Sequence, residues 1–505
     1  MPNTKKLLLI ILFAIIIRLP YINCPMHPDE GAYAYQGYFW LKGKEIYETR
    51  FFNRLPGLPL IYATAFKFFG TNPKAIRVFI ILYNTLSVLF VYLIGCKLLD
   101  EKKALISAFI FAYLSWSPIM RGVTGKEIFI ILPCLITIYF YLLYEGKNKK
   151  FLFLCGIFSG LSILISQTTF LLIFHFLIFT YFQSKKKIKD LSVYLFGLCI
   201  PVMLFLIHGA LVLGIKQLIY QIILYRTKSN SIFVGPAWYH LFRSIYSLTA
   251  SSFIFLIFAI ILGYQYLPKE EKFVKFFLFS YLIFSFLGAI SGGWWAFHYY
   301  LPLMPIISLW LGWCIPYIFK QKRLVKAIFF CCLLVPLIFY ICAFYYTKNY
   351  CLEFKSEYKL TKKLVKYLNN HCGKKIYAFL FYNPSIYFMS KKESALPYFF
   401  EDEILFVPER FKEIISTIKQ KKIDCLITYD LDYSLKIVQK LCDTNKPFMF
   451  LIKKCFSRHF TPFCKGYPIQ LSFIKKIFEM IPAYYKKIKI IPFKKGKIIV
   501  WKKQD

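Results

Sequence analysis

Residues 75–98 read AIRVFIILYNTLSVLFVYLIGCKL, and the two basic residues of this apolar run, Arg77 and Lys97, lie near its ends. A helix of about 20 mainly apolar residues crosses the roughly 30 Å hydrocarbon core of a bilayer. The run therefore predicts a transmembrane helix. Ten further runs fit the same template, namely 5–22, 104–120, 127–144, 151–167, 168–183, 190–213, 247–266, 273–290, 301–319 and 326–346.

The composition agrees with this interpretation. Of the 505 residues, 58% are hydrophobic and only 18% are charged. Soluble domains have nearer half apolar and a quarter charged residues, so a soluble globular protein and a disordered one are both excluded. The 15 cysteines form no CxxC pair and no spaced Cys/His set, which argues against a zinc site. We interpret the chain as an α-helical polytopic membrane protein with about 11 transmembrane helices.

Every second short loop along the chain is basic. The positive-inside rule places such loops in the cytoplasm, so the alternate loops and residues 347–505 are expected outside. This arrangement explains much of the net charge of +40 without any nucleic acid. If 151–183 formed one span instead of two, the C-terminal segment would lie inside the cell. The six basic loops are 1–6, 100–103, 146–150, 184–190, 268–275 and 320–326.

Residues 347–505 differ from the rest, because short β-rich runs alternate there with amphipathic helices. We expect a small extracytoplasmic α/β domain after a transmembrane domain of residues 1–346. Its lysines could attract anionic lipid headgroups or a phosphorylated glycan, or simply form a solvated surface. Disulfides would be permitted outside the cell, but their pairing does not follow from the sequence. The expected elements are strands at 375–381, 423–428 and 448–452, a helix with Phe411, Ile414, Ile415 and Ile418 on one face, and a hairpin of 488–491 and 497–501.

The acids of residues 1–346 all lie in loops or at the ends of spans. An ion-coupled transporter usually carries ionisable groups at mid-membrane depth, so their absence from the span centres argues against transport. The acids that could perform chemistry gather instead at one predicted interface.

Asp29 and Glu30 are the most distinctive pair. They follow Pro28 and open the first of two aromatic-rich segments, which are too short or too mixed to cross a membrane and are expected to lie along the outer interface. An acid after proline at a helix start could instead serve only as an N-cap. The local pattern leaves both roles open for Asp29. The two segments are 31–41, ended by Gly43, and 58–69, ended by Gly70.

Glu127 is the second candidate acid, at the point where the outer loop 121–126 enters a span. It too could be an acid in a first helical turn, where Lys126 could pair with it and alter its role. If the first outer loop folds over the membrane surface, Glu127 could face Asp29 across a cavity. Two neighbouring carboxylates can divide the roles of proton acceptor and of metal or positioning ligand.

Residues 27–33 read HPDEGAY and residues 51–60 read FFNRLPGLPL. An acid pair after the first span, followed by a basic residue ahead of a Pro-rich turn, resembles the GT-C fold glycosyltransferases that use polyprenyl-phosphate sugars. Within them the chain resembles the branch of the protein O-mannosyltransferases, the lipid A aminoarabinose transferases and the Rgt-like proteins. Further matches are Glu127 as the second acid, 156–167 as the Gly-rich fifth span, 298–305 (HYYLPLMP) as the motif before a late span, and 375–390 as the first strand and helix of the outer domain.

The resemblance implies an inverting integral-membrane glycosyltransferase in a bacterial or archaeal plasma membrane, with its active site facing outside. It would move a sugar from a polyprenyl-phosphate donor to an extracytoplasmic acceptor hydroxyl on a lipid, glycan or protein. Asp29 would be the general base. No cofactor is implied as required. The implied site contains the catalytic acids Asp29, Glu30 and Glu127; Arg54 and His298 for the donor phosphate; Tyr33, Trp295 and Tyr299 for acceptor or sugar; and, if a divalent metal binds, Asp29, Glu127 and His27 as its ligands.

Three alternatives remain open at this point. A glycan ligase or polymerase would use a diphosphate-linked donor and need a larger outer cavity. A glycolipid transporter would perform no chemistry, and a silent relative would serve as an assembly subunit. The joint presence of Asp29, Arg54 and Glu127 argues against a silent subunit.

Overall fold

The computed structural model describes residues 3–45, 55–116, 125–224, 253–291, 297–379, 384–397, 409–435, 467–493 and 496–504. The chain forms two compact units. Unit 1 consists of Met1–Pro25, Arg54–Ile215 and Pro236–Glu353, and unit 2 consists of Met26–Asn53, Lys216–Gly235 and Phe354–Asp505.

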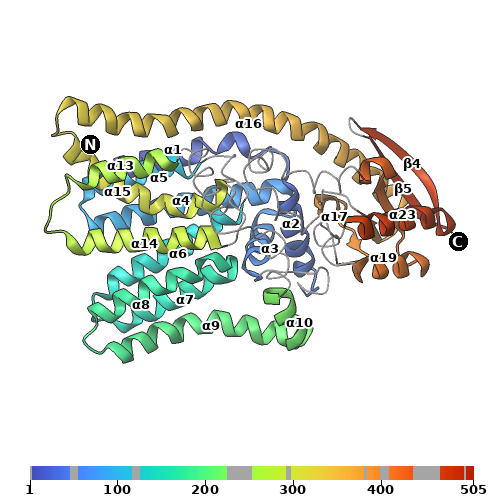
Figure 1. The fold of residues 1–505 in the computed structure, drawn as a ribbon, viewed down its shortest axis with the longest axis horizontal. Helices are drawn as coiled ribbons and strands as arrows, with labels where there is room; N and C mark the ends of the chain where they lie inside the picture. Colours follow the sequence, from blue (N-terminus) through green and yellow to red (C-terminus); the bar gives the residue numbers. More distant parts are fainter. Residues whose placement is uncertain are drawn as a thin grey trace. The chain divides into compact units, whose positions relative to one another are not determined.

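Unit 1 is helical, and each of the eleven predicted spans overlaps one of its helices (Figure 1). Five segments are long and apolar enough to cross a membrane among the described residues: α4, α6, α9, α14 and His298–Ile318, which includes α15. Five of the other predicted spans, in α1, α5, α7, α8 and α13, form helices of 12 to 17 residues, and the span predicted at 326–346 lies within the longer helix α16. Eleven membrane crossings are therefore not confirmed. The helices are α1 (Asn3–Ile16), α3 (Gly57–Phe69), α4 (Pro73–Leu98), α5 (Glu101–Leu114), α6 (Lys126–Tyr144), α7 (Lys149–Ile165), α8 (Leu172–Gln183), α9 (Lys187–Leu213), α13 (Phe253–Tyr264), α14 (Lys272–Ser291), α15 (Met304–Ile318) and α16 (Arg323–His371).

Residues 151–183 form two helices rather than one. A short 3-10 turn, η2 (Gln167–Leu171), separates α7 from α8. After η2 the chain turns back, so that the end of α8 lies beside the start of α7. A Cβ added at Gly146, just before α7, would lie 3.2 Å from the carbonyl oxygen of Gln183, at the end of α8. This geometry supports two membrane spans within residues 151–183, rather than the single span that the sequence left as an alternative.

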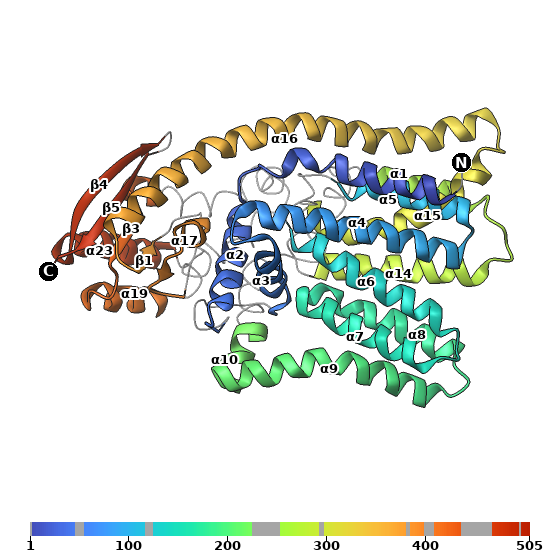
Figure 2. The same ribbon diagram turned by 180° about the vertical axis from the view of Figure 1, so that it is seen from behind.

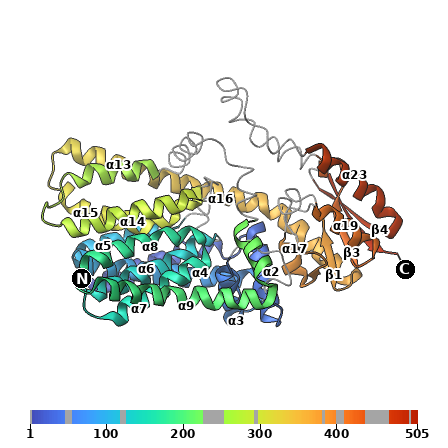
Figure 3. The ribbon, with the colours of Figure 1, turned by 60° about the horizontal axis from the view of Figure 1, so that its bottom comes forward.

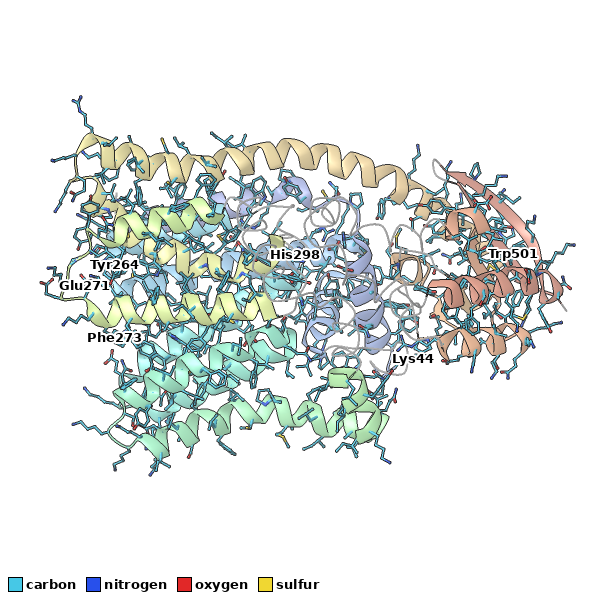
Figure 4. All side chains as sticks on the ribbon, viewed as in Figure 1. Lys44, Tyr264, Glu271, Phe273, His298 and Trp501 are labelled. Atoms are coloured by element: carbon cyan, nitrogen blue, oxygen red, sulfur yellow. A yellow bond between two sulfur atoms is a disulfide. The ribbon has the colours of Figure 1, made fainter. Side chains whose placement is uncertain are left out.

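The six basic loops share one end of unit 1. Figure 4 labels Tyr264, Glu271 and Phe273 at this end, and His298 at the other. Contacts connect the loops in pairs, which agrees with the alternation predicted from their charge. These contacts are Asn3–Glu101 at 2.6 Å, Lys97–Glu145 at 3.9 Å, Lys149–Asp190 at 3.0 Å, the Lys103 ammonium 5.3 Å from the ring centre of Tyr317, and Phe179–Phe273 with ring centres 5.8 Å apart.

Helices α7 and α9 pack side by side through glycines (Figure 2). A Cβ at Gly156 would lie 2.2 Å from the carbonyl oxygen of Tyr194, and one at Gly197 would lie 2.3 Å from that of Phe153. Small residues let helix backbones approach closely in membranes, where lipid gives no hydrophobic drive for helix association. The Gly-rich span predicted at 156–167 is therefore the contact face of this helix pair.

Unit 2 contains a five-stranded sheet of order β2-β1-β3-β5-β4. Strand β1 is parallel to β2 and β3, and β5 is antiparallel to both β3 and β4. The strands predicted at 375–381 and 423–428 and the terminal hairpin are confirmed, whereas 448–452 lies outside the described residues. The elements are α2 (Pro28–Leu41), α10 (Ile215–Ile219), the π-helix η3 (Tyr220–Leu224), β1 (Lys375–Ala378), α17 (Ser385–Ser390), β2 (Glu393–Ser394), α19 (Glu409–Lys419), β3 (Cys425–Tyr429), α23 (Tyr467–Tyr484), β4 (Tyr485–Phe493) and β5 (Gly496–Lys503).

The core of unit 2 lies between the sheet and the helices α19 and α23 (Figure 3). As predicted, Phe411, Ile414 and Ile418 lie on one buried face of α19, whereas Ile415, predicted on the same face, is partly buried. A disulfide joins Cys372, just after α16, to Cys425 in β3, a pairing that the sequence had left open.

Two features bear on the predicted boundary between residues 346 and 347. Helix α16 continues across it without interruption, from Arg323 to His371. The contacts also group residues 26–53, and with them α2, with the C-terminal segment. The division into domains 1–346 and 347–505 stays a prediction.

Candidate active site

The acid pair lies in the first turn of α2, as the motif predicts. His27 is the N-cap, Pro28 occupies the first helical position, and Asp29 and Glu30 follow. Proline is favoured there because it has no amide hydrogen to leave unbonded. The helix ends at Leu41, and Gly43 follows with a φ of +79°. The predicted segment 31–41 is thus confirmed as part of a helix.

The capping interactions separate the roles of the two acids. The side chain of His27 accepts a hydrogen bond from the Asp29 backbone N–H at 3.2 Å, through Nδ1. The Glu30 carboxylate in turn accepts one from the His27 backbone N–H at 2.6 Å, which completes a capping box. Glu30 is 1% exposed. Its carboxylate therefore holds the helix start together.

Asp29 is not the N-cap, so the alternative role considered for it is wrong. Its side chain is 39% exposed, and its carboxylate lies 3.7 Å from His27 Nδ1. Because that nitrogen accepts the Asp29 amide hydrogen, the imidazole carries its proton on Nε2 in this arrangement. Of the two acids, Asp29 is the one whose carboxylate is accessible to a substrate.

Tyr33 lies four residues after Asp29, on the same face of α2. It is 6% exposed. The position of Tyr33, one helical turn after Asp29, suits the predicted contact with a sugar or acceptor.

The second acid belongs to a cluster at the start of α6 in unit 1. The Glu127 carboxylate is 3% exposed and lies 3.9 Å from Lys126 Nζ. The predicted local pair with Lys126 is thus present. His298 Nε2 lies 4.0 Å from the same carboxylate oxygen. Glu127 is thus held between an ammonium and an imidazole, and a carboxylate fixed in this way suits a positioning role.

His298 and Tyr299 come from the 3-10 helix η4 (Phe297–Leu303), which precedes α15. His298 is 8% exposed, and its ring centre is 4.6 Å from that of Tyr299. The Lys126 ammonium lies 5.4 Å from the Tyr299 ring centre, within the range of a cation–π contact. The fold thus gathers three sequence-predicted groups, Glu127, His298 and Tyr299, at one end of unit 1.

Two predicted site residues, Arg54 and Trp295, lie outside the described residues. Asp29, Glu30, Tyr33 and His27 belong to unit 2, whereas Glu127, His298 and Tyr299 belong to unit 1. The approach of Glu127 to Asp29 stays a prediction.

The predicted metal ligands are already engaged in other contacts. His27 Nδ1 accepts the Asp29 amide hydrogen, and an ammonium flanks Glu127. No three His, Cys, Asp or Glu side chains gather at metal-binding distances within the part of the chain that the structure describes. A divalent cation held jointly by His27, Asp29 and Glu127 stays a prediction.

Two buried arginines in unit 1 were not predicted to matter. Arg77, in the first turn of α4, is 2% exposed and donates from Nη2 to the carbonyl oxygen of Pro25 at 3.2 Å. Arg18 is 1% exposed and donates to the Ala14 carbonyl oxygen at 2.8 Å and to Ser115 Oγ at 2.9 Å. A single arginine at the end of an apolar run is the signal that could have identified each. Both tie the chain on either side of η1 (Leu19–Tyr21) to unit 1.

Residues 53–212 match the model of the dolichyl-phosphate-mannose-protein mannosyltransferase family. This stretch includes Glu127 and the Gly-rich helix α7. No curated protein matches the sequence.

Solved structures match over most of the chain. ArnT from Cupriavidus metallidurans in the apo state gives a TM-score of 0.60 at 10% identity, covering 99% of this chain and 98% of that one. The same protein bound to undecaprenyl phosphate gives 0.54 at 10% identity, with 99% and 97% covered. The archaeal oligosaccharyltransferase AglB from Archaeoglobus fulgidus, in complex with an inhibitory peptide and a dolichol-phosphate, gives 0.52 at 12% identity, with 85% and 69% covered.

Together, these matches confirm the predicted fold. Both structural relatives are GT-C glycosyltransferases, and the family match lies within the same class. Identities of 10–12% carry a fold and no more.

Proposed function

We propose that this chain, which has the GT-C glycosyltransferase fold and a mannosyltransferase-family segment at residues 53–212, transfers a sugar from a polyprenyl-phosphate donor to an extracytoplasmic acceptor hydroxyl. The observation that carries the proposal is the state of Asp29. This acid stands at the N-terminus of α2, keeps 39% of its side chain exposed, and leaves the capping of the helix to His27 and Glu30. A carboxylate that is exposed at the start of a helix is accessible to a substrate.

The proposed reaction is a single displacement. The acceptor hydroxyl loses its proton to the Asp29 carboxylate, and its oxygen forms a bond to the anomeric carbon. The bond from that carbon to the donor phosphate oxygen breaks, and polyprenyl phosphate leaves from the opposite face of the sugar. The configuration at the anomeric carbon is therefore inverted. A positioned base contributes about 10²–10⁴-fold to such a step.

The remaining predicted residues take supporting roles in the proposal. Glu127, held between Lys126 and His298, positions the acceptor. His298 and Arg54 bind the donor phosphate, for which the planar guanidinium offers two parallel N–H donors. Tyr33, Trp295 and Tyr299 contact the sugar or acceptor. The similarity to ArnT bound to undecaprenyl phosphate supports a lipid-linked donor.

We place the reaction on the outer side of a bacterial or archaeal plasma membrane. Two observations support this orientation. The basic loops gather at one end of unit 1, whereas Glu127 and His298 lie toward the other (Figure 4). The Cys372–Cys425 disulfide, and the engagement of Cys24 in a disulfide, fit an oxidising compartment for the segments predicted outside.

The test is a transfer assay with the purified full chain in lipid nanodiscs. Radiolabelled polyprenyl-phosphate sugars serve as donors, a membrane glycolipid and glycan extract supplies acceptors, and release of sugar to water is counted too. Wild type, Asp29→Asn and Asp100→Asn are compared. Asp100 caps α5 at the basic end of unit 1, and asparagine caps a helix as well as aspartate does. Asp100→Asn therefore controls for the loss of one carboxylate.

The proposal expects transfer by wild type and Asp100→Asn, and a loss of about 10²–10⁴-fold in Asp29→Asn. Equal turnover by Asp29→Asn would remove this acid from the chemistry and transfer the role to Glu127. Polyprenyl-diphosphate oligosaccharides are tested in parallel as donors. Transfer from these donors alone would instead favour a glycan ligase or polymerase. The same protein is also placed in liposomes of the same lipid composition as the nanodiscs. Movement of labelled glycolipid across the liposome membrane without any glycosidic product would favour a transporter.

A further inference from the structure

Helix α2 belongs to the C-terminal unit by its contacts, although more than 300 residues of sequence separate the two. It packs against α17 and β2 through residues of one face. Gly31, Tyr35 and Tyr38 lie four and three residues apart, the spacing that aligns side chains along one side of a helix. This docking face is defined by those three residues.

The contact is closest at Gly31, two residues after Asp29. A Cβ at this position would lie 2.4 Å from the Cα and backbone nitrogen of Ser385, the first residue of α17. Real Cβ atoms do not approach backbone so closely, so only glycine permits this spacing. The start of α2 thus rests directly on the start of α17.

Tyr35 forms the second contact, one turn further along. It is fully buried, and its hydroxyl accepts a hydrogen bond from the backbone N–H of Ser394 in β2 at 3.0 Å. Its ring centre lies 5.7 Å from that of Tyr387. The Tyr387 hydroxyl accepts the backbone N–H of Ala378 in β1. A chain of contacts therefore runs from α2 into the sheet.

The far end of α2 is fastened as well. Tyr38 packs edge-on against Phe388, with ring centres 6.2 Å apart. Just beyond the helix, Lys44 Nζ lies 2.8 Å from the Glu393 carboxylate, and Figure 4 labels this lysine. Contacts along the whole length of α2 fix both its position and its rotation about its own axis.

That rotation determines the direction of Asp29. Each residue of an α-helix turns the chain by about 100°, so Asp29 lies about 200° from Gly31 and projects from the face opposite the docking face. We infer that the C-terminal domain is a positioning element for the acid, acting through Gly31 and Tyr35. This inference rests on the proposed function, in which Asp29 is the base.

Gly31→Ala is the sharpest test variant. Alanine favours a helix more than glycine does, so the change strengthens α2 by itself. The new methyl group must nevertheless push α17 away. A displacement of about 1 Å at a catalytic group can cost about 10²-fold in rate, and we expect kcat to fall by that order with the donor KM nearly unchanged. Tyr35→Phe keeps the ring but removes the hydrogen bond, worth about 1 kcal/mol, and should lower kcat by about fivefold.

Hydrogen exchange, measured by mass spectrometry on the full chain, reports on the packing of α2 against α17 and β2 independently of turnover. The Ser394 amide, which bonds to Tyr35, should exchange faster in both variants. Leu41→Ala is the control, because Leu41 lies at the end of α2 and is 41% exposed. It should alter neither the exchange of Ser394 nor kcat.

The outcomes separate the two claims. Faster exchange together with a lower kcat and an unchanged donor KM supports the inference. Faster exchange with wild-type kcat, in a protein whose Asp29→Asn form is inactive, overturns the positioning role and leaves the proposed function standing. Unchanged exchange at Ser394 in Gly31→Ala overturns the docking itself. A wild type that transfers no sugar overturns the proposed function and the positioning role together.

Discussion

The backbone N–H of His27 donates a hydrogen bond to the carboxylate of Glu30 at 2.6 Å, across the first turn of α2. Glu30 is consequently occupied by the fold, and its neighbour in sequence carries the accessible carboxylate. The two adjacent acids thus differ in role, because only the Glu30 carboxylate takes part in the capping box.

This difference predicts opposite responses at Glu30 and Asp29. Glutamine retains a carbonyl oxygen that can accept the His27 amide hydrogen, so Glu30→Gln should keep most of the activity. Glu30→Ala removes the acceptor and should destabilise the start of α2 by about 1 kcal/mol, which corresponds to about fivefold faster amide exchange in its first turn. Exchange and transfer are measured side by side. Inactivation by Glu30→Gln with unchanged exchange would assign Glu30 to the chemistry after all.

The cluster around Glu127 predicts coupled mutations. Lys126 Nζ and His298 Nε2 lie 3.9 and 4.0 Å from the same carboxylate oxygen, and all three side chains are nearly buried. Residues that share a buried network usually show interaction free energies of about 0.5–3 kcal/mol. The effects of Glu127→Gln and Lys126→Met on kcat/KM should therefore not add in the double variant. Strict additivity would mean that the two groups act separately.

The glycine contact between α7 and α9 predicts a folding defect without a catalytic cause. Gly156→Leu places a large side chain where a Cβ already meets the Tyr194 carbonyl oxygen at 2.2 Å. Overpacking of this kind costs about 1–3 kcal/mol or more. We expect a lower melting temperature and less monodisperse protein by size-exclusion chromatography. Leu161→Ala, an exposed position on the same helix, is the control and should behave like wild type.

The predicted orientation of the chain in the membrane can be tested by cysteine labelling. In intact cells, a membrane-impermeant maleimide should label Cys372, the partly exposed partner of the disulfide, only after a reductant opens the bond. A cysteine introduced by Lys102→Cys, in the basic loop 100–103 of unit 1, should stay unlabelled until the membrane is permeabilised. Peptide mass spectrometry distinguishes the sites. The reverse pattern would place the C-terminal domain in the cytoplasm.

Removal of that disulfide should loosen unit 2. The bond joins residues separated by 53 positions and ties the end of α16 to the middle of the sheet. Such cross-links typically contribute about 2–4 kcal/mol, chiefly by restricting the unfolded chain. The double variant Cys372→Ser/Cys425→Ser should therefore lower the unfolding temperature of unit 2 and speed amide exchange in β1 and β3. Cys96→Ser, which removes a free exposed thiol, should leave both unchanged.

The sequence alone predicted most of the helices and several of their ends, because those depend on nearby residues. The apolar runs specify spans, Pro28 begins α2, and glycines with positive φ follow α2 and α3, at Gly43 and Gly70. The terminal hairpin and the buried face of α19 follow equally from short-range periodicity. The GT-C fold could be inferred from local motifs for the same reason.

Only the tertiary structure decided which distant groups meet. Glu127 and His298 lie far apart in the chain, and their approach depends on η4 packing against α6. The docking of Gly31 on Ser385 and the pairing of Cys372 with Cys425 likewise depend on three-dimensional contacts between distant parts of the chain. A local pattern fixes the type of an element, but the direction in which its functional side chain points is set by the surfaces on which the element packs.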